Sequence, residues 1–163
     1  MTLNSTNRVS TKTIATVVEN TLTGQKSLYA AAEFQQGEVI CQFSAAETFE
    51  HPTYLTLQIG MDKHITLLPE FLQYTNHSCD PSAFFDTSRM ELICLTALQP
   101  GDEITFFYPS TEWEMAQPFS CNCGSTNCLQ VINGASQIPL HILAKYKLNE
   151  FIRQELMQAK KDL

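Results

Sequence analysis

The sequence predicts a mostly β domain of short strands, followed by an irregular segment that contains cysteines and then by a C-terminal helix. Up to about residue 108, short runs of β-branched or alternating apolar residues recur between turn-forming residues, which is typical of strands. From 109 to 139, turn formers and three cysteines replace this pattern, and beyond 139 the apolar residues recur with a helical period. The 163 residues suffice for one domain with a buried core and are too few for two full domains.

Eight strands are predicted before residue 108. The first is rich in β-branched residues, and Gly24 separates it from the second. Two alternating runs flank a glycine-containing loop over 59–63 and predict a hairpin. A short helical turn is predicted over 69–74, because proline is tolerated in a first helical turn. The predicted strands span 13–18, 27–30, 38–43, 54–58, 64–67, 83–86, 91–95 and 103–107.

The last part of the chain predicts one amphipathic helix that begins at Pro139. Because its apolar face must be covered, we expect this face to pack on the rest of the chain or on a second copy, which would make the protein a homodimer. The apolar face consists of Leu140, Ala144, Leu148, Phe151, Ile152, Leu156 and Ala159, and the polar face of Lys145, Lys147, Asn149, Arg153 and Lys160.

The charge distribution argues against a nucleic-acid partner. The chain carries 10 basic and 17 acidic side chains, a net charge of −7, and Lys63 and Arg89 are the only bases between residues 27 and 144. Binding to a nucleic-acid backbone needs clustered lysine and arginine, so we expect no direct contact with nucleic acid. An acidic surface suits a cationic partner, although solubility alone would also explain it.

The sequence also bears on where the protein resides. It has no run of about 18 uncharged apolar residues, so we expect no membrane span. Residues 1–8 lack the apolar core and cleavage site of a secretory signal. We therefore expect a cytoplasmic protein, or a nuclear one in a eukaryote, that is not secreted. In these compartments cysteine is more often a metal ligand or a core residue than half of a disulfide.

Three cysteines with metal-ligand spacing stand in the irregular segment. Cys121, Cys123 and Cys128 surround a glycine turn, and thiolates at this spacing can wrap a tetrahedral ion. A closed structural zinc site needs a fourth ligand. Cys79 lies in a loop just before a proline, whereas the other two cysteines lie inside predicted strands, where cysteine is often a core residue. We expect zinc on these four thiolates; the alternative is that the three cysteines are unrelated thiols.

Two further segments carry polar or aromatic side chains at the ends of predicted elements. Residues 76–81 read Asn-His-Ser-Cys-Asp-Pro, and a histidine in such a loop is more often a structural residue than a base. Residues 101–109 read Gly-Asp-Glu-Ile-Thr-Phe-Phe-Tyr-Pro, where alternation places Phe106 and Tyr108 on one face of the strand. The phenol at the strand end can project into a cleft, or these aromatic residues simply pack in the core.

Taken in order, residues 76–81, residues 101–108 and the Cys-x-Cys-x₄-Cys segment resemble a SET domain followed by its zinc-binding post-SET segment. The resemblance runs from about residue 13 to residue 128 and leaves the C-terminal helix outside. It implies a mostly β, β-clip-like SET fold of several small curled sheets with a pseudoknot at the active site. The expected domains are a SET domain over 1–115, a post-SET zinc-binding region over 116–134 and the C-terminal helix over 135–163.

The resemblance also implies an activity, because SET domains are protein-lysine methyltransferases that use S-adenosyl-L-methionine. The expected substrate is a protein with a basic, lysine-containing segment. Tyr108 would be the catalytic phenol, and Tyr74 and Phe106 would line the lysine channel. The cofactor would be held by Lys26, Ser27, Leu28, Asn76 and His77, and the structural zinc by Cys79, Cys121, Cys123 and Cys128.

Four positions differ from the pattern of the family. Residues 25–27 read Gln-Lys-Ser where members usually have Gly-x-Gly, which lets the backbone approach the cofactor. Gln73 stands in place of a frequent arginine, and Ser82 in place of a frequent asparagine. A second function therefore stays open from the sequence, that of a catalytically weak or inactive SET-fold zinc-binding interaction module.

Overall fold

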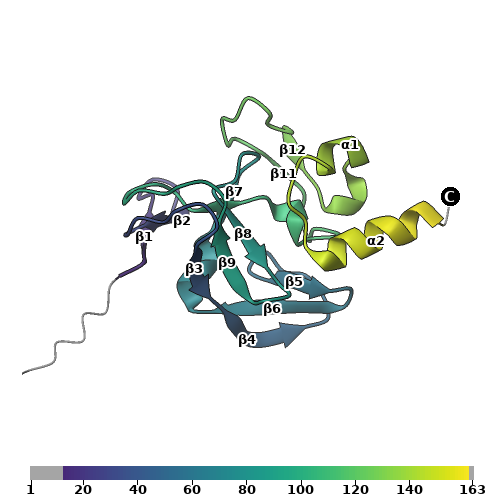
Figure 1. Cartoon of the computed structure of the whole chain (residues 1–163), viewed down its shortest axis with the longest axis horizontal. Coiled ribbons are helices and arrows are strands. Elements are labelled where there is room, and N and C mark those ends of the chain that lie inside the picture. The colour runs from purple at the N-terminus through teal and green to yellow at the C-terminus, as the bar shows by residue number, and fades with distance from the viewer. Residues whose placement is uncertain (1–12, 162–163) are drawn as a thin grey trace, which may run out of the picture.

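In the computed structural model, which describes residues 13–161, five small sheets form a curled β domain, and the C-terminal segment packs beside it (Figure 1). The predicted mostly β fold of several small sheets is confirmed. At one end β1 (Ala15–Glu19) pairs antiparallel with β2 (Lys26–Ala30). Gly24, at φ +71°, takes the left-handed conformation that the turn between them requires.

A three-stranded sheet supplies much of the core. Its order is β3 (Val39–Gln42), β9 (Glu91–Cys94) and β8 (Ala83–Asp86), all antiparallel. Phe85 and Leu92 are fully buried, and Cys94 is buried as the strand pattern predicted. These side chains belong to one apolar cluster that also includes Leu28 and Phe106, so the core lies directly behind the candidate site.

The second three-stranded sheet has the order β4 (Ser44–Phe49), β6 (Lys63–Leu68) and β5 (Leu57–Gly60). Strand β4 was not predicted, because its residues are all exposed and lack the alternation that marks a strand with one buried face. Its conformation comes from pairing with β6. The predicted strand over 54–58 begins later, at Leu57, because the backbone and hydroxyl of Thr56 bond back to Thr53 and form a turn there.

A short parallel pair joins two segments that are distant in the sequence. After a 3₁₀ turn, η1 (Glu70–Tyr74), strand β7 (Asn76–His77) pairs with β10 (Thr105–Phe106). The Ser78 amide extends the pairing by donating to the Phe106 carbonyl at 3.0 Å. This crossing brings the loop that contains Asn76 and His77 beside the strand that leads into Tyr108.

Beyond Tyr108 the chain consists of short elements. These are η2 (Tyr108–Ser110), the pair β11 (Phe119–Ser120) and β12 (Val131–Ile132), η3 (Ala135–Gln137), α1 (Leu140–Leu143) and α2 (Glu150–Lys161). The prediction of one continuous helix from Pro139 is therefore wrong, because residues 144–149 separate two helices.

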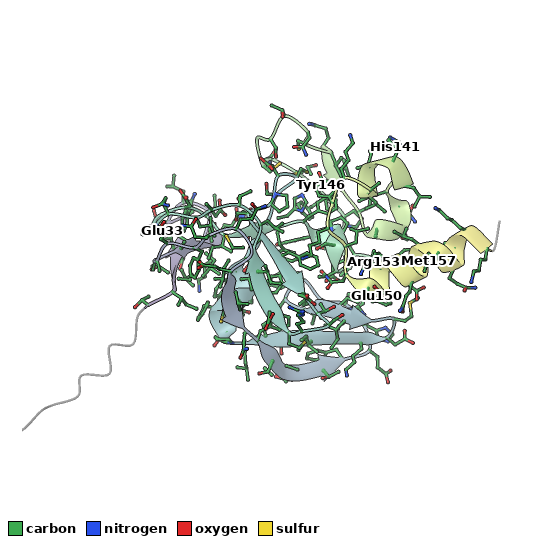
Figure 2. The ribbon with its side chains drawn as sticks, viewed as in Figure 1. Glu33, His141, Tyr146, Glu150, Arg153 and Met157 are labelled. Atoms are coloured by element: carbon green, nitrogen blue, oxygen red, sulfur yellow. The ribbon has the colours of Figure 1, made fainter. Side chains whose placement is uncertain are left out.

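Two side chains between α1 and α2 explain the interruption. The Tyr146 ring stacks on Phe107, with centroids 3.6 Å apart, and its hydroxyl donates to the Cys79 carbonyl at 2.7 Å. In Figure 2, Tyr146 lies close to α1 and to the start of α2. In one continuous helix, neither Tyr146 nor Asn149 would make its contacts with the β domain. The tertiary contacts therefore override the local helical preference.

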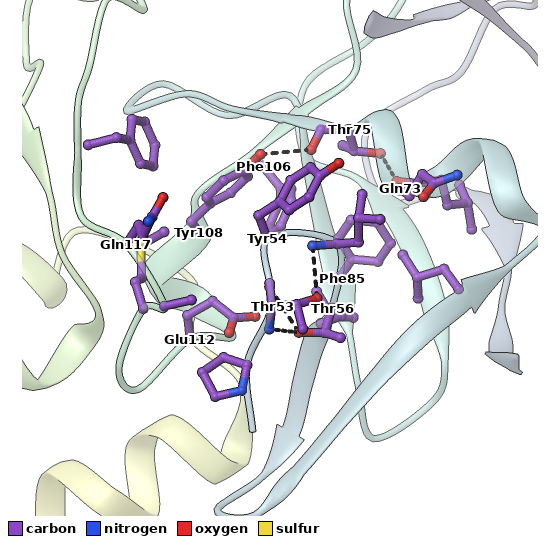
Figure 3. Close-up of a pocket in the computed structure, with 18 of the residues that line it drawn as sticks. Thr53, Tyr54, Thr56, Gln73, Thr75, Phe85, Phe106, Tyr108, Glu112 and Gln117 are labelled. Carbon is purple, nitrogen blue, oxygen red and sulfur yellow. Dashed lines mark hydrogen bonds between the residues drawn. The ribbon is translucent and has the colours of Figure 1, made fainter. Parts of the chain in front are cut away.

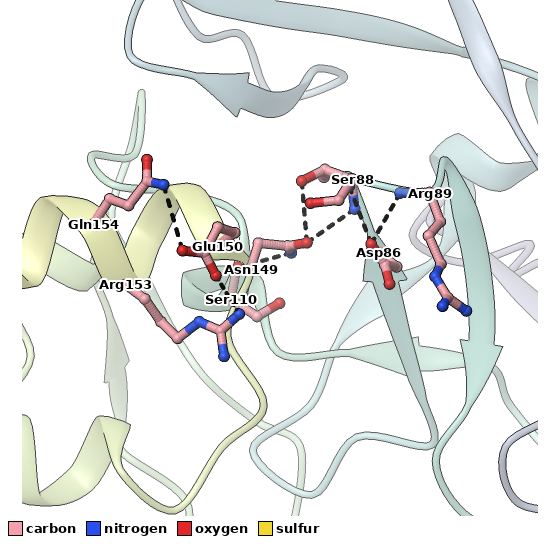
Figure 4. A network of polar contacts seen from close by, with 9 residues as sticks. Asp86, Ser88, Arg89, Ser110, Asn149, Glu150, Arg153 and Gln154 are labelled. Atoms are coloured by element: carbon pink, nitrogen blue, oxygen red, sulfur yellow. Dashed lines mark hydrogen bonds and ion pairs between the residues drawn. The ribbon is translucent and has the colours of Figure 1, made fainter.

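Asn149 is buried, although the helical pattern placed it on the polar face. Its amide nitrogen donates to the Phe85 carbonyl at 2.8 Å and the Ser110 carbonyl at 3.0 Å. Its amide oxygen accepts from the backbone and hydroxyl of Thr87. Figure 4 shows this network between the end of β8 and the start of α2.

The apolar residues of the C-terminal segment pack on the same chain. Leu143 and Ile152 are buried in a second cluster with Phe107 and Ala135. The homodimer expected through this segment stays a prediction. None of the helices found between residues 13 and 161 has the length and apolar character needed to cross a membrane.

Candidate functional site

Asn76 joins the predicted cofactor residues. Its amide nitrogen donates to the Lys26 carbonyl at 3.1 Å and to the Ser27 hydroxyl at 2.8 Å. Strand β2, which carries Lys26, Ser27 and Leu28, therefore lies against the start of β7. The five residues predicted to hold the cofactor therefore lie on two segments that contact each other, β2 and β7.

The Gln-Lys-Ser sequence at 25–27 is accommodated without backbone strain. Lys26 and Ser27 are regular strand residues paired with Glu19 and Val18 of β1. Among residues 13–161, the non-glycine residues with positive φ are Met90 and Gln130. Glycine is favoured where φ is positive, and the strand conformation of Lys26 and Ser27 does not call for it.

His77 connects Tyr108 to the cysteines. Its Nδ1 accepts the Tyr108 backbone N–H at 3.2 Å, and its Nε2 lies 3.3 Å from the Cys79 sulfur. Burial lowers the pKa of His77 to about 4, so the ring is neutral at pH 7. Because Nδ1 is the acceptor, we assign the ring proton to Nε2, facing the sulfur. Both ring nitrogens are thus engaged within the protein.

Tyr108 lies at the centre of an aromatic group. Its ring centroid is 4.6 Å from that of Phe106, 5.2 Å from that of His77 and 5.8 Å from that of Phe119. Its hydroxyl donates to the Thr75 carbonyl at 3.4 Å. Burial, with a smaller contribution from the carboxylate of Glu112, raises the pKa of Tyr108 to about 12, so the phenol is neutral at physiological pH.

A cavity of about 650 Å³ opens in front of Tyr108, a size typical of ligand sites (Figure 3). Phe106, Leu72 and Phe85 form part of its wall on the core side, and Phe119 closes it from the segment after η2. Tyr54, which is 89% exposed, stands at its rim. The cavity therefore presents aromatic surface and a phenol to whatever enters it.

Tyr74, predicted to lie in the same channel as Phe106, is not among the described residues that line this cavity. Its ring lies instead beneath the Lys26 ammonium, whose nitrogen is 5.1 Å from the ring centroid. The structure therefore brings Phe106 and Tyr108 together and places Tyr74 on the side of the predicted cofactor residues.

Sequence reasoning missed Glu112, the one acidic side chain among the described residues that line the cavity. It is only 7% exposed, and burial raises the pKa of its carboxyl to about 7. The available signal was its spacing, because Glu112 follows Tyr108 by four residues, one turn of a helix. The segment has no helical period, so the sequence did not indicate that the two side chains face the same space.

The four cysteines predicted to bind zinc converge. Their sulfur atoms all lie within 4.8 Å of one another, and those of Cys79 and Cys121 are 4.0 Å apart. Ligands at about 2.3 Å from a tetrahedral zinc ion are about 3.8 Å apart, so the donor set fits this metal. The Leu129 amide donates to the Cys79 sulfur at 3.4 Å, which suits a thiolate ligand.

Comparison with known proteins places these features in a family. A model of the SET domain matches residues 25–109. Methyltransferase flvH of Aspergillus flavus is 42% identical over 122 residues, which are 74% of this chain and 68% of that protein. The H3 lysine-36 specific histone-lysine N-methyltransferase of Saccharomyces cerevisiae is 30% identical over 95 residues, 55% of this chain but only 13% of that much longer protein.

The fold has solved counterparts. The crystal structure of KRYPTONITE in complex with mCHG DNA and SAH superposes with a TM-score of 0.55 over 71% of this chain and 28% of that one. The two sequences are 19% identical, so this likeness concerns the fold. A second structure of KRYPTONITE, which also contains an H3(1-15) peptide, gives a TM-score of 0.53.

Proposed function

The chain belongs to the SET-domain family of methyltransferases, and on this basis we propose that it transfers a methyl group from S-adenosyl-L-methionine to the ε-amine of a lysine in a protein substrate. The observation that carries this proposal is the position of the Tyr108 phenol. It projects into an aromatic cavity and lies next to the β7–β10 crossing that holds Asn76 and His77.

The residues around β2 and β7 fit a polar cofactor. When bound, S-adenosyl-L-methionine supplies an electrophilic methyl group. Asn76 and the β2 backbone would hold it, because Asn76 already fixes Ser27 and keeps its amide oxygen without a hydrogen-bond partner among the described residues. The ring of His77 is engaged elsewhere, so we expect this residue to contribute through its backbone.

The aromatic cavity prepares the acceptor amine. A lysine with a pKa near 10.4 must lose its proton before it can attack, which costs about 4–5 kcal/mol at neutral pH. Phe106, Phe119 and Tyr108 desolvate an ammonium that enters the cavity, and desolvation lowers its pKa. The neutral phenol of Tyr108 then orients the amine lone pair and contributes its oxygen to the transition state.

We assign a structural role to the cysteine cluster, with zinc as the metal. A zinc ion on the four thiolates would hold residues 119–132 against the β7 loop through Cys79. The same segment carries Phe119, which packs edge-on against both Tyr108 and His77. The metal would therefore stabilise one wall of the cavity and take no part in methyl transfer.

The test is transfer of a radiolabelled methyl group to lysine-containing peptide arrays and cell lysates. We expect Tyr108→Phe to reduce transfer by about 100-fold or more, because it removes the hydroxyl from the reacting centre. Tyr29→Phe is the matched control, since Tyr29 lies in β2 and does not line the cavity. The proposal fails if the wild-type protein binds the cofactor yet labels no lysine, or if Tyr108→Phe labels as well as the wild type.

The non-catalytic module remains the competing function, and it rests on the Gln-Lys-Ser sequence at 25–27. The extended conformation of Lys26 and Ser27 supports the enzyme, because their backbone is free of the strain that only glycine would relieve. Titration calorimetry with S-adenosyl-L-methionine separates the two functions. Binding that weakens at least about tenfold in Asn76→Ala supports the enzyme, and no binding by the wild type supports the module.

A further inference from the structure

Glu112 is a buried acid with no cationic partner in the cavity. Of the described residues that line the cavity, Glu112 is the only one with a charged side chain, and no lysine, arginine or histidine faces it there. The single ion pair found between residues 13 and 161 joins Arg153 and Glu150 on α2. A carboxylate withdrawn from water without a partner is unfavourable, so its presence in a ligand-sized cavity calls for an explanation.

The local structure holds one carboxyl oxygen and leaves the other available. The Glu112 amide donates to the Tyr108 carbonyl at 3.0 Å, which places the two side chains one turn apart. Oε1 accepts hydrogen bonds from the Gln58 amide at 2.9 Å and the Thr111 hydroxyl at 3.0 Å. Oε2 has no hydrogen-bond partner among the described residues and is not among their fully enclosed unpaired atoms, so it retains access to the cavity.

The carboxyl and the phenol point to different parts of the cavity. In Figure 3 the Tyr108 hydroxyl is directed toward Thr75, whereas the Glu112 carboxyl is directed toward Thr53. The two groups therefore face different residues of the cavity wall, so a cation held by the Glu112 carboxyl would occupy a different position from an amine held at the Tyr108 hydroxyl. The carboxyl is therefore placed to bind a positive charge other than the one that must be lost at Tyr108.

We propose that Glu112 is the counter-ion for a second cationic group of the methyl acceptor, so that the preferred acceptors carry two positively charged groups. This inference rests on the proposed function, since it concerns the same cavity. An ammonium or guanidinium that enters satisfies Oε2 and compensates the buried charge. The acceptor would thus be oriented at two points, by Glu112 through its charge and by Tyr108 at the reacting amine.

The test uses n-butylammonium as the cation and 1-butanol as its neutral counterpart, with affinities measured by ligand-observed NMR. We expect the wild type to bind the ammonium at least about tenfold more tightly than the alcohol at pH 8.5. Glu112→Gln should abolish this preference while it leaves alcohol binding unchanged. The amide oxygen of glutamine can still accept from Gln58 and Thr111, so the local structure is retained. An unchanged preference in Glu112→Gln, or none in the wild type, overturns the inference.

The wild-type pH profile tests the inference even if Glu112→Gln fails to fold. With a pKa of about 7, the carboxyl becomes more ionised between pH 6.5 and 8.5, so ammonium affinity should rise by about fourfold while alcohol affinity stays constant. The other titratable groups nearby do not follow this profile. Tyr108 has a pKa of about 12, and the pKa of His64, which faces Gln58 across β5 and β6, is lowered. A flat ammonium profile contradicts the inference.

Failure of this inference and failure of the proposed function give different results. If the chain methylates lysine but ammonium binding does not depend on Glu112, only the inference fails. If ammonium binding depends on Glu112 but no substrate is methylated, the cation site stands and the enzymatic proposal fails. Tyr108→Phe, which keeps the carboxyl, should retain the preference for the ammonium and therefore separates the two ends of the cavity.

Discussion

The imidazole of His77 links the candidate active site to the cysteine cluster. One ring nitrogen accepts the Tyr108 amide, and the other faces the Cys79 sulfur. The position of the phenol therefore depends on a residue that also contacts a cysteine of this cluster. Because His77 is neutral at pH 7, this link adds no charge to the cavity, and Glu112 is the group there whose ionisation changes near neutrality.

The buried carboxyl of Glu112 has a measurable effect on stability. Its pKa rises from an ordinary 4.5 to about 7 in the folded protein, so its contribution to stability is full below pH 4.5 and is lost as the pH rises through 7. We expect Glu112→Gln to match the wild type near pH 4.5 and to be more stable at pH 8.5, by about 3 kcal/mol as an upper bound. Urea unfolding at both pH values measures this difference. An equal difference at both pH values would contradict it.

Two short elements position the site. The parallel β7–β10 pair brings Asn76 beside Thr105, and the β11–β12 pair presents Phe119 to Tyr108. Each strand of these pairs has only two residues, too few to be stable alone. Their stability comes from what surrounds them, namely the core behind β10 and the cysteine cluster beside β11.

Zinc removal tests the second of these elements. We expect about one equivalent of zinc by metal analysis, lost in Cys121→Ser because three thiolates do not close a tetrahedral site. Cys41→Ser is the matched control and should keep its zinc, since Cys41 lies in β3 outside the cluster. Hydrogen exchange after chelation should increase over residues 119–132 more than in β8 and β9. Full protection of 119–132 without metal would contradict the assignment.

Asn149 provides the corresponding test for the C-terminal segment. Its side chain bonds to Phe85, Thr87 and Ser110, so it joins the start of α2 to β8 and η2. Asn149→Ala should destabilise the protein by about 2–4 kcal/mol, because it leaves buried polar groups unpaired. Gln154→Ala, on the exposed face of α2, should change stability by less than about 0.5 kcal/mol. Chemical denaturation of both variants gives the comparison, and equal effects would show that the network is not structural.

At the scale of the whole molecule, the charge is distributed unevenly. The domain that contains the site is strongly acidic, whereas most of the basic residues lie near the two ends of the chain. We expect a field of this sign to favour basic segments of a substrate and to disfavour nucleic-acid backbones. The apolar cavity then selects which part of the substrate enters.

This field predicts how methyl transfer depends on salt. If a basic peptide is the substrate, raising the salt concentration from 50 to 300 mM should increase its KM by about threefold or more, because surface charges are screened. The kcat should change little, since screening of surface charges acts on the encounter with the substrate and not on the chemical step. The control is n-butylamine, if it is methylated, because it lacks the additional basic residues of a peptide. Its KM should depend less on the salt concentration. A salt-independent KM for the basic peptide would argue against electrostatic recruitment.

Much of the site was predictable because it is encoded in local signals. The cysteine spacing, the Asn-His loop and the aromatic strand end each appear as consecutive residues in the sequence. The strands over 83–86 and 91–94 were predictable for a similar reason, because their buried residues follow a local pattern. By contrast, no local sequence pattern distinguishes β4 from a loop. Likewise, none distinguishes the two separate helices of the C-terminal segment from one continuous helix.

By itself the sequence determined the fold class, the four cysteines that converge and the segments that meet at Tyr108, because each depends on residue types at fixed spacing. Only the tertiary structure decided that Tyr146 and Asn149 interrupt the last helix, and that Glu112 shares the cavity with Tyr108. The physical reason is that burial and hydrogen-bond partners are properties of distant contacts. From the sequence alone a glutamate is expected to be solvated, and only the fold shows that this one is buried beside aromatic residues.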